Sequence, residues 1–154
     1  MQSIVFYQMK TTMHRILLLT PLLIASALLA ETIAVDACAL VTKAEAEKIL
    51  GELREAPKPE TGIQQEKECN YTNKEGAWLK VSVYSSERWG MQKGTVSEMN
   101  PTVLPGLGEE AFAVKRGTTH EIYIRKGKLI LEISSTVGLE VTKKFAETAV
   151  KQLP

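Results

Sequence analysis

Cys38 and Cys69 are the only cysteines of the chain and the residues with the clearest chemistry. Two thiols can form a disulfide, bind a metal or act in catalysis, and the compartment decides among these roles. A basic lead with Lys10 and Arg15 precedes an apolar stretch, residues 16–30, in the layout of a secretory signal peptide. Because thiols of an exported chain meet an oxidising environment, we expect a Cys38–Cys69 disulfide.

The apolar stretch could instead be a membrane anchor that is never removed. It is only about 15 residues long and contains Thr20 and Pro21, whereas spanning a bilayer takes about 20 apolar residues. Glu31 ends it without the basic cluster that favours retention in a membrane. The pattern therefore favours a cleaved signal peptide.

Two small-x-small triplets suit a signal peptidase, Ala25-Ser26-Ala27 and Thr32-Ile33-Ala34. We assign residues 1–34 to the signal peptide and residues 35–154 to one exported domain. Translation from Met9 or Met13 would give a more compact signal peptide.

Lipidation is an alternative fate for Cys38, because Val35-Asp36-Ala37-Cys38 follows the apolar stretch and ends in a cysteine. A lipobox has small or apolar residues before its cysteine, so Asp36 and the upstream Glu31 disfavour this reading. Lipidation would also leave Cys69 as an unpaired thiol in an oxidising compartment.

The other residues with chemical potential form no recognisable catalytic or metal-binding pattern. His120 is the only histidine in residues 35–154, and no Gly-x-Ser-x-Gly motif accompanies it. The acidic doublet Glu109-Glu110 follows a glycine-rich turn and is the only pair of adjacent carboxylates that suggests a metal site. The Gly106-x-Gly108 pattern of this turn precedes a predicted strand. Phosphate-binding loops precede a helix, so this pattern indicates an ordinary turn. We expect no catalytic, metal or cofactor site.

Aromatic residues offer a possible binding face. Trp78 and Tyr84 alternate with Leu79, Val81 and Val83, so they lie on the opposite face of one predicted strand, and Trp89 follows closely. Exposed aromatic rings can stack on sugars, peptides or a protein. The alternative is that a helix covers Trp78, Tyr84 and Trp89 and makes them part of a second small core.

Helices are expected near both ends of the domain. Thr42-Lys43-Ala44-Glu45 is a capping box, so a helix should run from Lys43 to Leu50 and end at Gly51. A second helix is expected from Leu139 to Leu153, with apolar residues at helical spacing. The expected core-facing positions of the first helical region are Leu40, Ala44, Ala46, Ile49 and Leu50, and those of the last helix are Val141, Phe145, Ala149 and Leu153.

Between the helices lie two groups of strands. Residues 69–72 and 77–85 flank the turn-forming residues 73–76 and predict a hairpin, which a weak strand and a loop precede at residues 52–67. Residues 110–115, 120–125 and 128–134 predict an antiparallel meander, and residues 86–99 a short helix or an irregular crossover. The fold class is therefore α+β, with an antiparallel sheet of five to six strands packed against N-terminal and C-terminal helices.

Charge excludes some partners. The chain carries 19 Lys and Arg against 18 Asp and Glu, and the two signs are mixed along it. Without a basic block, electrostatic capture of nucleic acid or of an acidic membrane surface is not indicated.

Several segments together resemble small secreted domains of unknown function, known from actinobacterial exported lipoproteins and a related kinase extracellular sensor domain. These segments are Asp36-Ala37-Cys38-Ala39-Leu40-Val41-Thr42, Cys69-Asn70-Tyr71 and Pro105-Gly106-Leu107-Gly108-Glu109-Glu110-Ala111-Phe112, with the closing amphipathic helix. The resemblance spans nearly all of residues 35–154 and implies an exported α+β domain with a Cys38–Cys69 disulfide. It implies no activity, and the chain lacks both a kinase segment and a convincing lipobox.

We therefore expect a secreted or periplasmic domain that binds an envelope protein or a small ligand without catalysis. A structural or stress-related envelope protein is the alternative, and a hydrolase is less favoured.

Overall fold

Seven strands form one antiparallel sheet in the order β1-β2-β3-β7-β6-β5-β4. The strands are β1 (Pro59–Thr61), β2 (Lys67–Thr72), β3 (Trp78–Ser85), β4 (Thr102–Val103), β5 (Glu110–Arg116), β6 (Thr119–Lys126) and β7 (Leu129–Ser135). The α-helices are α1 (Ala37–Leu40), α2 (Lys43–Leu50), α3 (Trp89–Val96) and α4 (Leu139–Gln152), and short 3-10 turns occupy Ile63–Gln65, Ser86–Arg88 and Ser97–Met99. The α+β class and the antiparallel sheet are confirmed.

This computed structural model describes residues 33–154. The expected signal peptide, residues 1–34, lies outside the described residues except for its last two positions. The triplet Ala25-Ser26-Ala27 lies outside them as well.

The strand count exceeds the expected five to six because both edge strands are short. β1 lies within the segment where a weak strand was expected, whereas β4 was not anticipated. A two-residue strand after Pro101 shows no alternation in the sequence, and it exists because Thr102 and Val103 pair with Ala113 and Phe112 of β5.

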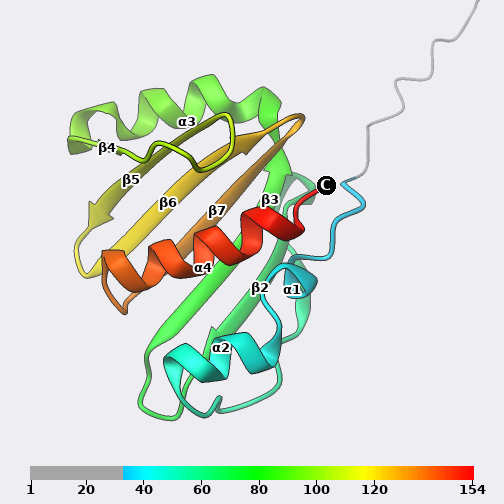
Figure 1. Ribbon diagram of the computed structural model, residues 1–154. Coiled ribbons are helices and arrows are strands. Elements are labelled where there is room, and N and C mark those ends of the chain that lie inside the picture. The colour runs from blue at the N-terminus through cyan, green and yellow to red at the C-terminus, as the bar shows by residue number, and fades with distance from the viewer. Residues whose placement is uncertain (1–32) are drawn as a thin grey trace, which may run out of the picture. The chain divides into compact units, whose positions relative to one another are not determined.

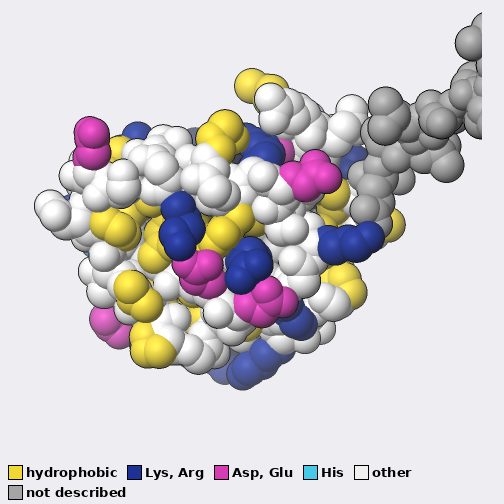
Figure 2. Space-filling model, turned by 90° about the horizontal axis from the view of Figure 1, so that it is seen from above, with side chains coloured by type: hydrophobic (Ala, Val, Ile, Leu, Met, Phe, Trp, Pro, Cys, Tyr) yellow, Lys and Arg dark blue, Asp and Glu magenta, His cyan; other side chains and the backbone are white. Residues whose placement is uncertain are grey.

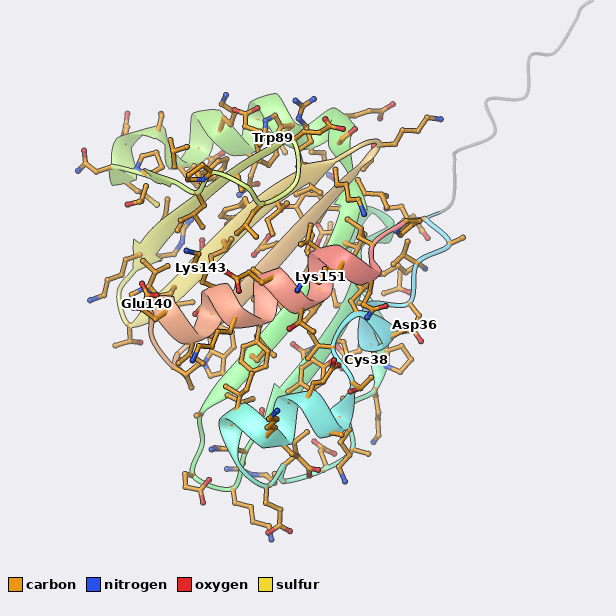
Figure 3. The ribbon with its side chains drawn as sticks, viewed as in Figure 1. Asp36, Cys38, Trp89, Glu140, Lys143 and Lys151 are labelled. Carbon is orange, nitrogen blue, oxygen red and sulfur yellow. A yellow bond between two sulfur atoms is a disulfide. The ribbon has the colours of Figure 1, made fainter. Side chains whose placement is uncertain are left out.

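The first face of the sheet carries the main hydrophobic core. In Figure 1, α4 lies across this face, and α1 and α2 lie on the same side. Phe145, Ala146 and Ala149 of α4 are fully buried against strand residues such as Leu131 and Ile133. Burial of this one stripe of an otherwise polar helix is what attaches α4 to the sheet, while Lys143 and Lys151 lie along its outer side (Figure 3).

Helix α2 has the predicted bounds and the predicted start. The Thr42 hydroxyl accepts a hydrogen bond from the Glu45 amide at 3.3 Å, and the Glu45 carboxylate accepts one from the Thr42 amide at 2.7 Å. These two bonds satisfy donors that the first helical turn leaves without partners. Ala46 and Leu50 face the core as expected, whereas Ala44 and Ile49 are exposed, because only one stripe of so short a helix reaches the sheet.

The expected disulfide is present and joins α1 to the sheet. Cys38 of α1 is bonded to Cys69 of β2, and Cys69 is fully buried (Figure 3). Lipidation of Cys38 is incompatible with this bond, since both sulfurs are used. The Tyr71 hydroxyl donates to the Val41 carbonyl at 2.5 Å, so a second contact holds the same region.

The second face is covered only in part, by α3. Trp89 and Val96 of α3 pack on Tyr84, Phe112 and the strand residues beside them. The full cluster is Tyr84, Trp89, Val96, Phe112, Val114, Tyr123 and Ile130. The crossover is therefore helical, and this second cluster includes no residue of β1 or β2.

Among residues 33–154, no helix is long and apolar enough to cross a membrane.

Candidate functional site

The aromatic residues do not form an exposed binding face. Tyr84 is 2% exposed and Trp89 is 8% exposed, and only Trp78 stays partly accessible. The ring centroids of Trp89 and Phe112 lie 5.1 Å apart, and those of Phe112 and Tyr123 lie 5.2 Å apart. Of the two alternatives, the second core holds for Tyr84 and Trp89, which α3 and the neighbouring rings bury, whereas Trp78 lies outside that cluster.

Apart from Trp78, the rest of this sheet face is polar, and the strand register places its residues in rows. Glu68 of β2 pairs with Ser82 of β3, which pairs with Glu132 of β7. The adjacent row is Asn70, Lys80 and Ser134. Directly paired residues share a face, so six side chains converge there. We call Glu68, Asn70, Lys80, Ser82, Glu132 and Ser134 the open half-face.

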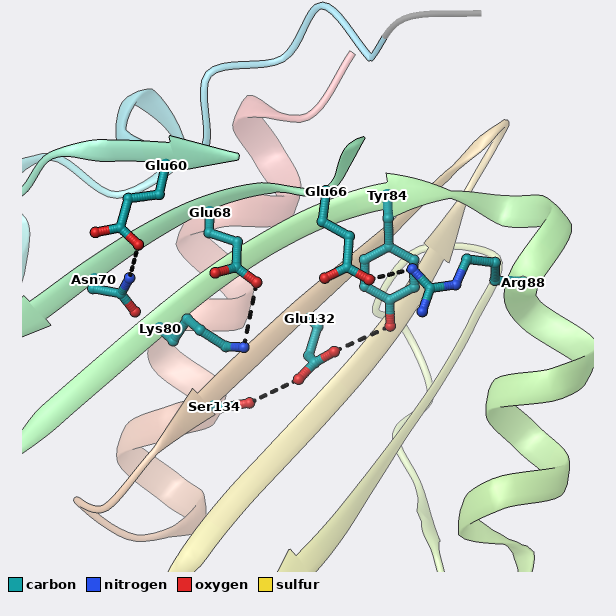
Figure 4. Close-up of polar contacts among 9 residues, drawn as sticks. All are labelled: Glu60, Glu66, Glu68, Asn70, Lys80, Tyr84, Arg88, Glu132 and Ser134. Carbon is teal, nitrogen blue, oxygen red and sulfur yellow. Dashed lines mark hydrogen bonds and ion pairs between the residues drawn. The ribbon is translucent and has the colours of Figure 1, made fainter. Parts of the chain in front are cut away.

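Glu132 is the central carboxylate of the open half-face. Its two oxygens accept hydrogen bonds from the Tyr84 hydroxyl at 3.1 Å and from the Ser134 hydroxyl at 3.0 Å (Figure 4). Burial raises the pKa of Glu132, although Lys80 and the two hydroxyls act in the opposite direction. Burial, together with the neighbouring Glu132, also raises the pKa of Tyr84 far above its usual value.

Ion pairs order the side chains around Glu132. The Lys80 ammonium lies 3.6 Å from the Glu68 carboxylate, and Arg88 pairs with Glu66 (Figure 4). The Arg88 guanidinium also lies over the Tyr84 ring, 4.7 Å from its centroid, where a cation is attracted to the aromatic face. Charged side chains are thus held in place before anything binds.

Neither Ser82 nor His120 forms a nucleophile–base pair with Glu132. The Ser82 hydroxyl is buried and has no hydrogen-bond partner among the described residues, so no base activates it there. His120 of β6 pairs with Ser135 of β7, and the next residue of β6, Glu121, pairs with Ser134. Successive strand residues point to opposite faces, so His120 and Glu132 lie on different sides of the sheet.

The acidic doublet has structural partners. Glu110 accepts hydrogen bonds from the Lys93 ammonium at 2.5 Å and from the Trp89 indole at 2.8 Å, and these two donors, Lys93 foremost, lower the pKa of Glu110. Glu109 accepts from the Gly127 amide at 2.9 Å, which joins the glycine-rich turn to the β6–β7 turn. Within residues 33–154, no cluster of three histidine, cysteine or acidic residues could hold a metal ion.

The described cavities lie away from the open half-face. A cavity of about 520 Å³ is bounded by Ile33, Leu129 and Pro154 among others, and a second of about 450 Å³ by Pro59 and Lys67 among others. A third, of about 250 Å³, adjoins His120. None of the three is lined by a residue of the open half-face, whose members range from the buried Ser82 and Ser134 to the exposed Asn70.

Comparison of the chain with protein families, with curated proteins and with solved structures finds no match. The resemblance to small secreted domains stays a prediction.

Sequence reasoning missed Glu132 and Ser134 as members of a polar surface. The signal was present, because Glu132 interrupts the otherwise apolar β7 at a position facing away from Leu131 and Ile133. Lys80 and Ser82 alternate with core residues in the same way. What the sequence lacked was the pairing of β3 with β7, which brings the two polar sets together.

Proposed function

We propose that residues 35–154 act in the periplasm or outside the cell as a binding domain, which recognises a protein partner through the open half-face without catalysing a reaction. The observation that carries the proposal is the ordered polar network around Glu132, Lys80 and Glu68, which lies on the sheet beside the second cluster.

The chemistry of this surface favours a protein partner over a small ligand. Small molecules are usually held in concave, mainly apolar pockets, whereas the open half-face consists of charged, amide and hydroxyl groups on a sheet. On the face of the domain that Figure 2 shows, basic and acidic side chains are likewise interspersed. A partner with complementary mixed charges and hydrogen-bonding groups would match the open half-face, because complementary charges across an interface give specificity.

The ion pairs also lower the cost of binding. Ordering a long side chain at an interface costs roughly 0.5–1.5 kcal/mol, and Lys80 and Arg88 already have partners in the free domain. Asn70 is exposed, and its amide donates to Glu60 at 3.2 Å, so an exposed member of the half-face is also oriented.

Export is supported by the disulfide, which forms and persists in oxidising compartments. The basic residues Lys10 and Arg15 before the apolar residues 16–30 support export independently of the disulfide.

Site-specific photo-cross-linking in the organism that encodes the protein tests the proposal. A photoreactive amino acid at Asn70 should give a discrete protein adduct in the extracytoplasmic fraction, whereas the same amino acid at Lys144, exposed on α4, should not. Lys80→Glu should remove the Asn70 adduct, because it puts a third carboxylate beside Glu68 and Glu132, and the control Lys144→Glu should leave it intact. Equal adducts from both positions, no adduct from Asn70, or recovery of the protein only from the cytoplasm would contradict the proposal.

A further inference from the structure

The three residues before the N-cap of α1 belong to the folded domain. Ile33 packs against both hydrophobic clusters of the sheet, and Val35 packs against the first. Ile33 lies in the part of the chain that we assigned to the signal peptide from the sequence.

The same three residues bound two cavities. Ile33, Ala34 and Val35 line the cavity of about 520 Å³ together with Leu129 and Pro154. They also line the cavity of about 450 Å³ beside β1. Residues 33–35 therefore form a wall common to both cavities, next to the point where β7 begins and the chain ends.

Cleavage after Ala34 would remove most of this wall. It would take away Ile33, the residue of this segment that contacts both clusters, and with it part of the lining of the cavity that Leu129 also lines. Burial of apolar surface stabilises a fold in proportion to its area, so a mature chain beginning at Val35 would be less stable than a longer one. The triplet Ala25-Ser26-Ala27 offers small residues at both positions that a signal peptidase reads, and it lies upstream of the wall.

We infer that the signal peptide is removed at Ala25-Ser26-Ala27, and that Ile33–Val35 stay in the mature protein. Water hydrolyses the Ala27–Leu28 peptide bond, leaving a carboxylate on Ala27 and a new amino group on Leu28. The inference rests on the proposed export of the chain, and it moves the start of the mature domain upstream of Val35.

The mass and the N-terminal sequence of the exported protein test it directly. The full chain is expressed in a bacterium with its own leader, and the protein is recovered from the periplasm. A mature chain that begins at Leu28, or at another residue before Ile33, supports retention of the wall. A chain that begins at Val35 or later overturns the inference and leaves the proposed export standing, whereas an uncleaved chain with two free thiols overturns both.

A stability measurement supplies a second test that does not depend on the peptidase. In the protein beginning at Leu28, Ile33→Ser should lower the melting temperature by about 3 to 8 °C, since it removes an apolar contact with both clusters. The matched control is Ile63→Ser, because Ile63 is 82% exposed, and it should leave the melting temperature unchanged. An Ile33→Ser variant that melts together with the control would overturn the inference.

Discussion

Removal of the Cys38–Cys69 disulfide should destabilise the domain by a predictable amount. The two cysteines are 31 residues apart, and in the chain-entropy model a cross-link of this span lowers the entropy of the unfolded chain by about 12 cal/mol/K, or about 3.7 kcal/mol at 25 °C. With an unfolding entropy of about 2.1 cal/mol/K for each of about 120 residues, this corresponds to a melting temperature lower by roughly 15 °C. Typical domains are stable by about 5–15 kcal/mol, so the loss is large.

The double variant Cys38→Ala, Cys69→Ala is the suitable perturbation. Alanine retains Cβ at the fully buried Cys69 position and introduces no polar group there, whereas serine would bury a hydroxyl. Urea unfolding followed by circular dichroism measures the free energy of unfolding, and a thermal scan measures the shift in melting temperature. Reduction of the unaltered protein should cause the same loss of stability, while a reductant should not change the stability of the variant. Coincident unfolding curves for the oxidised protein and the variant would refute the reasoning.

Three further predictions concern single side chains. Glu132→Gln should raise the free energy of unfolding at pH 7 and lose this advantage below about pH 4. Because the pKa of Glu132 is raised in the folded state, folding favours the protonated carboxyl group. The contribution of Glu132 to stability therefore falls as the pH rises from the unfolded pKa through the folded pKa. Thermal scans at several pH values measure this, and a gain that does not vary with pH would contradict it. Thr42→Ala should cost about 1 kcal/mol by removing the capping box, while Thr118→Ala, in an exposed turn, should be neutral in the same urea titration. Gly108→Ala should cost clearly more than Gly117→Ala. Both glycines have positive φ, which costs an alanine about 1–2 kcal/mol, but only at Gly108 would a new Cβ meet a backbone oxygen at 2.5 Å. Equal losses at the two glycines would contradict the role of that close contact.

The elements predicted best are those specified by local chemistry. The capping box at Thr42 places the start of α2, and the turns at residues 117–118 and 127–128 separate three strands of clear alternation. Each of these signals acts over a few residues, so sequence alone carries it.

The elements predicted poorly depend on partners far along the chain. β4 is a strand only because β5 lies beside it, and Ile49 is exposed only because of the way α2 sits on the sheet. The fate of Tyr84 was left open for the same reason, since a period-two pattern shows which face a side chain is on and not what covers that face. The polar network around Glu132 needed the β3–β7 pairing, which no local pattern encodes.

The position of β7 between β3 and β6 has a consequence for biosynthesis. β3 pairs with β2 on one edge, and its other edge has no partner until β7, one of the last elements to be translated, has been made. A nascent chain that carries only the first hairpin therefore presents an unpaired strand edge, which is a site for pairing with other chains. Completion of the sheet has to wait for the end of synthesis, and contacts between distant parts of a chain slow that step. During this interval the unpaired edge of β3 makes the incomplete chain prone to aggregation.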